Sequence, residues 1–146
     1  MFNNIVVVCV GNICRSPMAE ALLAHGLASR EEVKVSSAGL GALVGEPADP
    51  LAQALMEEAG LDISAHRARQ LSPLITREAD LILVMEPGHR EAVAKMDVSA
   101  RGKCYLLGHW EEGLEVADPY RKPREAFEQA LRTIERGVNG WVARLG

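Results

Sequence analysis

A short loop between a run of valines and an expected helix start carries the residue types that phosphate chemistry needs. It reads Cys-Val-Gly-Asn-Ile-Cys-Arg-Ser from Cys9 to Ser16. Because the backbone N–H groups of a tight loop before a helix point inward, and the helix dipole adds positive potential, such a loop binds an anion. No Gly-Lys-Ser or Gly-Lys-Thr follows, so the loop is not the nucleotide-binding kind that holds magnesium. The spacing predicts a cradle for a phosphate dianion.

Each side chain of this loop has an expected role. Arg15 can hold two phosphate oxygens in a bidentate grip. Cys9 lies at the bottom of the anion site, where positive potential favours the thiolate, and a thiolate facing a phosphate is a nucleophile. Ser16 can donate a hydrogen bond to that sulfur and make it a better leaving group. The phosphate-binding N–H groups would come from Val10, Gly11, Asn12, Ile13, Cys14 and Arg15. Two of these, Gly11 and Asn12, tolerate the dihedral angles of a tight loop.

Phosphoryl transfer to a cysteine also requires a proton donor for the departing oxygen. A tyrosine phenoxide, whose conjugate acid has a pKa near 10, leaves poorly without one. Asp118, in the stretch EVADPYRK, is the candidate, with Pro119 stiffening its loop and Tyr120 able to flank an aromatic leaving group. The same Asp would later accept a proton from the water that cleaves the phosphocysteine. An Asp-Pro pair alone usually marks only a turn, so this role depends on the cysteine loop.

The elements that must position these groups alternate along the chain. Apolar runs predict four strands, at residues 5–9, 33–37, 81–85 and 103–107. Helix signals predict four helices, at residues 17–27, 50–59, 87–96 and 123–145. Ser16 is expected to cap the first of these helices and Asp49 the second. The alternation favours an α/β fold, an open four-stranded parallel sheet with helices on both faces, as in flavodoxin-like or Rossmann-like three-layer sandwiches. In such folds ligands bind at the carboxyl ends of the strands, which is where the cysteine loop lies.

The length and composition of the chain exclude several classes of protein. The 146 residues, of which 48% are hydrophobic, amount to one domain with a proper core. With 16 Lys and Arg against 20 Asp and Glu, the net charge of −4 gives no support for nucleic-acid binding. The opening MFNNIVVVCV has no basic leader, and its apolar run is too short for a signal peptide or a membrane span. We therefore expect a cytoplasmic protein without membrane insertion, whose three cysteines are reduced thiols.

The motifs CVGNICRS and DPY together resemble the low-molecular-weight protein tyrosine phosphatases. SSAGL and SAHRARQL extend the resemblance over essentially the whole chain, which implies a single phosphatase domain spanning residues 1–146. The resemblance implies that Cys9 is the nucleophile, Arg15 binds phosphate, Ser16 tunes the thiolate and Asp118 is the general acid. It also implies that the enzyme uses no metal or organic cofactor.

Two supporting residues come from the same resemblance. Ser37 and His66 are implied to fix the loop residue Asn12 through hydrogen bonds. From the sequence alone, His66 could be this structural hydrogen-bonder or an ordinary surface residue.

Within that family the sequence is most similar to the bacterial enzymes of capsule and exopolysaccharide export, through SAGLGALVG, GHW and DPYRK. This implies a phosphotyrosine protein as substrate, the tail of a membrane tyrosine autokinase. We expect the enzyme to act as a monomer. Leu40 stands where eukaryotic members have an aromatic wall residue, and Arg121 follows Tyr120 where they commonly have a second tyrosine. Leu40 and Tyr120 are therefore expected to flank the substrate.

Two other functions could use the same loop. An arsenate reductase would need further paired cysteines to relay oxidation, and only Cys104 lies outside the loop. A non-catalytic phosphotyrosine-binding module would need neither Cys9 nor Asp118. His25, His89 and His109 show no ligand spacing, which disfavours a metal site.

The other two cysteines, Cys14 and Cys104, could have structural roles. Cys14 could form a disulfide with Cys9 and so protect it from irreversible oxidation, or it could be a small buried group. Cys104 lies in an apolar run and is expected in the core.

Overall fold

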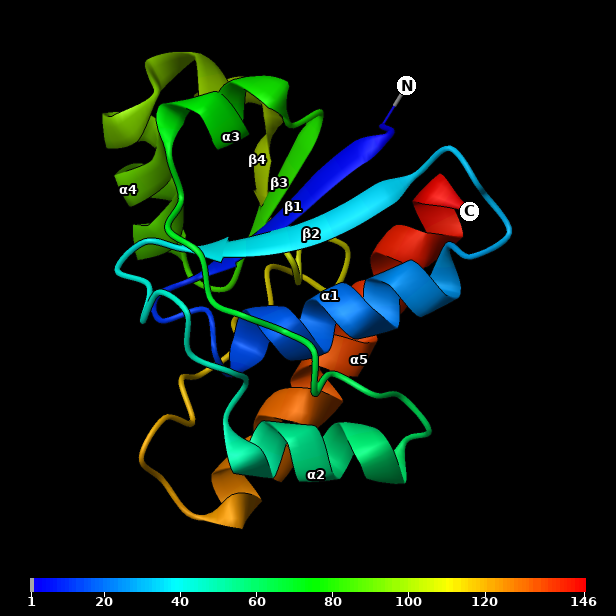
Figure 1. The fold of residues 1–146 in the computed structure, drawn as a ribbon. Helices are drawn as coiled ribbons and strands as arrows, with labels where there is room; N and C mark the ends of the chain where they lie inside the picture. Colours follow the sequence, from blue (N-terminus) through cyan, green and yellow to red (C-terminus); the bar gives the residue numbers. More distant parts are fainter. Residues whose placement is uncertain (1) are drawn as a thin grey trace.

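The computed structural model describes residues 2–146, which form a parallel sheet between two layers of helices (Figure 1). The strands, in the spatial order β2-β1-β3-β4, are β1 (Asn4–Cys9), β2 (Lys34–Gly39), β3 (Leu81–Val84) and β4 (Cys104–Leu106). The helices are α1 (Arg15–Gly26), α2 (Pro50–Glu58), α3 (Pro73–Glu78), α4 (Pro87–Met96) and α5 (Arg124–Leu145), with a 3-10 turn η1 (Val98–Lys103) before β4. The predicted open four-stranded parallel sheet is confirmed.

The helices cover both faces of the sheet. Helices α1, α2 and α5 lie on one face, and α3 and α4 lie on the other (Figure 1). Consecutive β1 side chains point to opposite faces, so Val7 joins the larger core cluster and Val8 the smaller one. Both are fully buried, which explains why β1 reads as an unbroken valine run rather than an alternating pattern.

The start of α1 differs from the prediction. Ser16 was expected as its N-cap, but the cap is Cys14, and no side chain accepts a hydrogen bond from the first turn. The reason is that the Ser16 hydroxyl is turned toward Cys9 Sγ instead. Uncapped N–H groups therefore remain at the end of α1 that follows the loop, the end where an anion is stabilised. The cap predicted for α2 is confirmed, since Asp49 Oδ1 accepts from Leu51 N at 2.9 Å.

The long helix α5 covers the face of the sheet that carries the larger core cluster. Its apolar stripe is buried, with Phe127, Ile134, Val138 and Trp141 each no more than 4% exposed. Packing of this stripe against α1 and the sheet holds the loops at the carboxyl end of the sheet in place. In the part of the chain that the structure describes, no helix is long and apolar enough to cross a membrane.

Candidate active site

Three loops meet at the carboxyl ends of β1, β3 and β4. Chain crossovers leave β1 toward β2 on one side, while β3 and β4 lie on the other, so the loop after β1 stands at the topological switch point. A pocket of about 140 Å³ opens here. Its lining residues are Cys9, Val10, Gly11, Ile13, Cys14, Arg15, Gly41, Leu43, Asp118 and Tyr120.

Cys9 forms the floor of this pocket. Its side chain is buried, and Sγ lies 2.9 Å from Ser16 Oγ. Asn12 Nδ2 donates to the same hydroxyl at 2.8 Å. Because the Asn12 amide fills an acceptor position on Ser16 Oγ, the hydroxyl hydrogen is free to point at the sulfur. The network thus favours Ser16 as donor to Cys9, an arrangement that stabilises a thiolate.

Asn12 fixes the shape of the loop. It is fully buried with φ of 60°, the left-handed region that asparagine tolerates. Its Nδ2 also donates to Ser37 Oγ at 3.0 Å, and its Oδ1 accepts from Arg69 N at 2.9 Å. His66 Nε2 lies 2.6 Å from the Asn12 carbonyl oxygen, which can only accept, so Nε2 carries the proton. Ser37 in turn donates to Glu20 Oε1 at 2.5 Å. The predicted contacts of Ser37 and His66 with Asn12 are both present, and the partners Glu20 and Arg69 were not foreseen.

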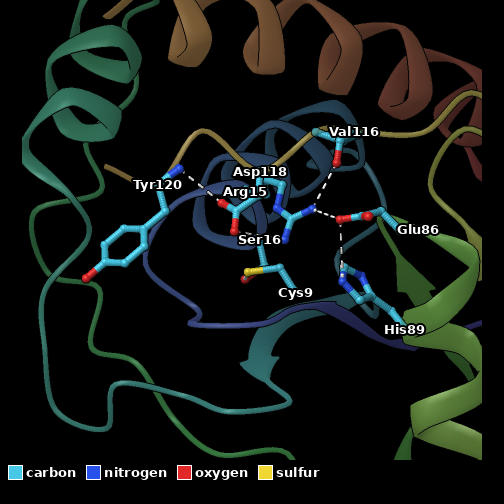
Figure 2. Close-up of polar contacts among 8 residues, drawn as sticks. All are labelled: Cys9, Arg15, Ser16, Glu86, His89, Val116, Asp118 and Tyr120. Atoms are coloured by element: carbon cyan, nitrogen blue, oxygen red, sulfur yellow. Dashed lines mark hydrogen bonds and ion pairs between the residues drawn. The ribbon is translucent and has the colours of Figure 1, made fainter. Parts of the chain in front are cut away.

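Arg15 lies above Cys9 with its side chain almost completely buried. Its Nη1 donates to Glu86 Oε2 at 2.6 Å and to the Val116 carbonyl oxygen at 2.9 Å (Figure 2). Its Nη2 lies 3.7 Å from Asp118 Oδ2. The guanidinium is therefore oriented through Nη1, while Nη2 faces the side of the pocket where Asp118 lies.

Sequence reasoning missed Glu86 and His89, which lie beside Arg15. Glu86 directly follows the apolar run of β3 at its carboxyl end, and a carboxylate in that place was the signal available. His89, on the first turn of α4, is buried, and its Nε2 lies 3.6 Å from Glu86 Oε2. Burial, helped by the positive charge of Arg15, lowers the pKa of His89 despite the nearby carboxylates. His89 is therefore neutral at neutral pH.

Asp118 and Tyr120 come from the loop between β4 and α5. Asp118 is exposed, and its Oδ1 accepts from Tyr120 N at 3.0 Å, which fixes the carboxylate on the Arg15 side of the loop (Figure 2). The Tyr120 ring is 39% exposed and stands at the rim of the pocket. Arg121, with φ of 64°, places its guanidinium 5.3 Å from the centre of that ring. The loop thus brings both predicted residues to the mouth of the site.

The expectation that Leu40 flanks the substrate stays a prediction. Leu40 is half-buried against the smaller core cluster and does not line the pocket. Its N–H donates to the Cys9 carbonyl oxygen at 2.9 Å, so the chain continues the course of β2 through this residue and turns outward only afterwards. Leu43, which is 41% exposed, forms the pocket wall instead. With Tyr120 it makes apolar walls suited to a flat ring.

The other two cysteines are buried free thiols. Burial raises the pKa of the Cys14 thiol well above its ordinary value, and the negative charge of Asp49 adds to this. Cys104 is in the core, as predicted, and burial raises its pKa to about 11. No group of three or more potential metal-ligating side chains comes together within residues 2–146.

Comparison with known proteins gives one consistent answer. The family described as low molecular weight phosphotyrosine protein phosphatase matches residues 4–146. The chain is 50% identical to the low molecular weight protein-tyrosine-phosphatase Wzb of Escherichia coli K12, over 99% of this chain and 97% of that protein. It is 49% identical, with the same coverage, to the probable low molecular weight protein-tyrosine-phosphatase EpsP of Ralstonia nicotianae. Among solved structures, the tyrosine phosphatase Wzb from Escherichia coli K30 in complex with sulphate is 42% identical, covers all of both chains and superposes with a TM-score of 0.94.

Proposed function

The chain belongs to the low molecular weight phosphotyrosine protein phosphatase family, in its bacterial capsule and exopolysaccharide group, and from this premise we propose that it hydrolyses phosphotyrosine through a phosphocysteine on Cys9. One observation carries the mechanism. Cys9 Sγ lies on the floor of the pocket, 2.9 Å from Ser16 Oγ, and Arg15 and Asp118 line the same pocket.

In the first step, the Cys9 thiolate attacks phosphorus, and the bond from phosphorus to the tyrosine oxygen breaks. The loop N–H groups and Arg15 hold the phosphoryl oxygens, whose negative charge increases in the transition state. Asp118 gives its proton to the departing phenoxide. The products of this step are the substrate protein with an unphosphorylated tyrosine and a phosphocysteine at residue 9 of the enzyme.

In the second step, Asp118, now a carboxylate, takes a proton from water as the water oxygen attacks phosphorus. The sulfur–phosphorus bond breaks, and the thiolate leaves with the hydrogen bond from Ser16 already in place. Inorganic phosphate is released, and Cys9 and Asp118 return to their starting states. All residues in these steps come from one chain, so we propose that residues 1–146 act as a single phosphatase domain.

The walls of the pocket support an aromatic ester rather than a small alkyl one. Leu43 and Tyr120 present apolar surface at the mouth, while Cys9 and Arg15 lie buried at the bottom. A phosphotyrosine ring would reach through the apolar walls and place its phosphate on Cys9. The shorter phosphoserine side chain would leave those walls unfilled.

We further propose that the protein substrate is a bacterial membrane tyrosine autokinase that controls exopolysaccharide or capsule production. The proposal is supported by the group of relatives to which the chain is most similar. Action on such a kinase would place this enzyme in the cytoplasm. Neither nucleic acid nor membrane insertion is required by this role.

Two rival functions fit the geometry less well. An arsenate reductase relay would need Cys104, but Cys104 belongs to the smaller core cluster and Cys9 to the larger one, on opposite faces of the sheet. A mere phosphotyrosine-binding module would not need a hydroxyl aimed at a cysteine sulfur.

The deciding experiment measures phosphate release from a phosphotyrosine peptide and a phosphoserine peptide, with EDTA present. Wild type should act on phosphotyrosine alone. Cys9→Ser should abolish turnover, and Asp118→Ala should slow it by about a hundredfold or more. Matched controls are Cys104→Ala in the core and Glu115→Ala on the same loop as Asp118, which should leave the rate within about twofold.

Acid-quenched wild-type protein mixed with substrate should carry phosphate on the Cys9 peptide in mass spectra. Binding of the peptide without turnover would contradict the enzymatic role. Turnover of the peptide without action on an autophosphorylated membrane tyrosine kinase would remove only the proposed partner.

A further inference from the structure

A second hollow lies at the end of the sheet opposite the Cys9 loop. It has a volume of about 590 Å³ and reaches from Leu81, where β3 begins, to Leu145, where α5 ends. Figure 1 shows the start of β1 and the end of α5 on this side, away from the loop that follows β1. None of the residues that line this hollow lines the catalytic pocket.

Aromatic rings form one wall of the hollow. Trp110 packs edge to face on His109 and on Trp141, with ring centres 4.7 and 5.6 Å apart, and Tyr105 meets Trp141 at 5.8 Å. Trp141 is held by its Nε1–H, which donates to the Leu106 carbonyl oxygen at 3.3 Å. Trp110, by contrast, is 39% exposed. The wall therefore presents an aromatic surface that is anchored from behind and open in front.

A glycine in α5 allows Trp110 to lie close to that helix. Gly140 lies inside α5, where glycine is less favourable than alanine. A Cβ at residue 140 would lie 2.9 Å from Trp110 Cβ, closer than side-chain atoms pack. The glycine is thus explained by the close approach of Trp110 to the helix, which the catalytic pocket at the other end of the sheet does not use.

One positive charge at the hollow has no carboxylate partner. The Arg144 guanidinium lies 4.2 Å from the centre of the Trp110 ring, and within residues 2–146 it makes no ion pair. Arg30 also lines the hollow, but it already donates to the Leu145 carbonyl oxygen at 2.5 Å and pairs with Glu32 at 3.5 Å. No Asp or Glu is among the described lining residues. Arg144 is therefore the group that can take an incoming anion.

We propose that this hollow is a second ligand site, which takes a flat aromatic ring bearing an anionic group. The ring would lie against Trp110, the exposed ring of the wall, and the anion would pair with Arg144. The volume falls within the range of small-molecule sites, roughly 300–1,000 Å³. A phosphotyrosine side chain and a purine nucleotide share this chemistry. The proposal stands on residues outside the catalytic pocket and does not depend on the phosphatase mechanism.

The chain contains its own reporter for this site. Trp110 and Trp141 are its only tryptophans, and neither lines the catalytic pocket. Their indole N–H signals in ¹⁵N-labelled protein can be followed by NMR while three probes are added: phenylphosphonate, AMP, and a phosphotyrosine peptide on the Cys9→Ser protein. Saturating inorganic phosphate, which carries an anion but no ring, is added first to fill the catalytic pocket.

The expected result is a saturable shift of the indole signals with phenylphosphonate in the presence of phosphate. Arg144→Gln should weaken this binding about tenfold, since it removes a charged hydrogen-bond donor. Arg101→Gln, an exposed arginine on η1, is the matched control and should change nothing. Whichever of the two probes, the phosphotyrosine peptide or AMP, binds with higher affinity identifies the class of the natural ligand.

Several results would overturn the site. Unshifted indole signals with all three probes would do so, as would a shift that phosphate alone reproduces. Equal affinity in wild type and Arg144→Gln would also remove it. A second variant, Gly140→Ala, keeps the guanidinium but pushes Trp110 aside, and unchanged affinity in this variant would show that the aromatic wall takes no part. Hydrolysis of phosphotyrosine by the wild-type protein is unaffected by any of these outcomes.

Discussion

Arg15 is oriented before any phosphate binds, because Glu86 and the Val116 carbonyl oxygen hold Nη1 from behind. A free arginine side chain would lose about 2 kcal/mol of rotamer entropy on gripping an anion. Here that ordering is already done in the folded protein. In the proposed mechanism, Glu86 is thus a positioning residue that acts on phosphate through Arg15.

We expect Glu86→Gln to lower kcat/KM for a phosphotyrosine peptide by about tenfold to a hundredfold, because a charge-assisted hydrogen bond becomes a neutral one. The affinity for inorganic phosphate should change less, since removing the carboxylate also removes a negative charge near the anion. Steady-state kinetics and phosphate inhibition measure the two effects. Glu91→Gln, an exposed change of the same charge on α4, is the control. Equal losses in both variants would show that general charge, rather than the hold on Arg15, matters.

His89 gives the folded protein a specific pH dependence. Its pKa is lowered by burial and by Arg15, so it takes up a proton more readily in the unfolded chain than in the folded one. Stability from neutral His89 is therefore complete above the unfolded pKa, about 6.5, and is lost as the pH falls toward the folded pKa. Urea unfolding of wild type and His89→Asn at pH 7.5 and 5.5 measures this. The variant should lose less free energy of unfolding over that interval, and an identical loss would show that other groups set the acid sensitivity.

At the residue scale, the sequence predicts best those candidate side chains that lie close together along the chain. Cys9, Arg15 and Ser16 lie within eight consecutive residues, so their spacing alone predicts an anion site. Glu86 and the Val116 carbonyl oxygen reach Arg15 only through the packing of β1, β3 and the loop after β4. A backbone carbonyl leaves no sequence signal at all. The sequence also does not predict that Leu40 packs against the smaller core cluster, because whether a loop residue faces the core or the pocket depends on where the strand ends.

Elements were predictable where a long periodic pattern or a cap defined them. The apolar stripe of α5 and the Asp49 cap of α2 are both confirmed. Helix α3 was missed because its six residues are too few for a periodic signal. Its start signal was nevertheless present, since Ser72 Oγ accepts from Ile75 N at 3.4 Å and Pro73 opens the first turn. The failed Ser16 cap has a different cause, because the site uses that hydroxyl for Cys9.

Gly137 of α5 provides a test at the element scale. A Cβ at this position would lie 2.9 Å from the Leu107 carbonyl oxygen, a backbone atom that cannot move aside easily. Gly137→Ala should therefore destabilise the protein by up to about 2 kcal/mol, because the gain of about 1 kcal/mol in helix propensity offsets only part of an overpacking cost of about 1–3 kcal/mol. Urea unfolding measures the change. Asn139→Ala, at an exposed neighbouring position, should instead be neutral or slightly stabilising. A stabilised Gly137→Ala protein would show that α5 can move away from β4.

At the scale of the whole molecule, the candidate oxyanion site joins three segments that lie far apart in the sequence. The start of α1 supplies Arg15, the turn after β3 supplies Glu86, and the loop before α5 supplies Asp118. An anion bound by Arg15 needs all three segments in place, because the same guanidinium is held by Glu86 and faces Asp118. Binding at this point should therefore stabilise the entire fold rather than one loop.

Inorganic phosphate at a hundred times its Kd should raise the free energy of unfolding by about 2.7 kcal/mol. For a chain of this size that corresponds to an increase in Tm of roughly 5–10 °C. Arg15→Lys keeps the charge but loses the planar grip, so phosphate should raise its Tm much less at the same concentration. Thermal melts in phosphate and in chloride of equal ionic strength separate site binding from salt effects. A Tm that rises equally in both proteins would mean that phosphate stabilises the chain by general exclusion from its surface, and that Arg15 is not the residue through which the anion acts on the fold.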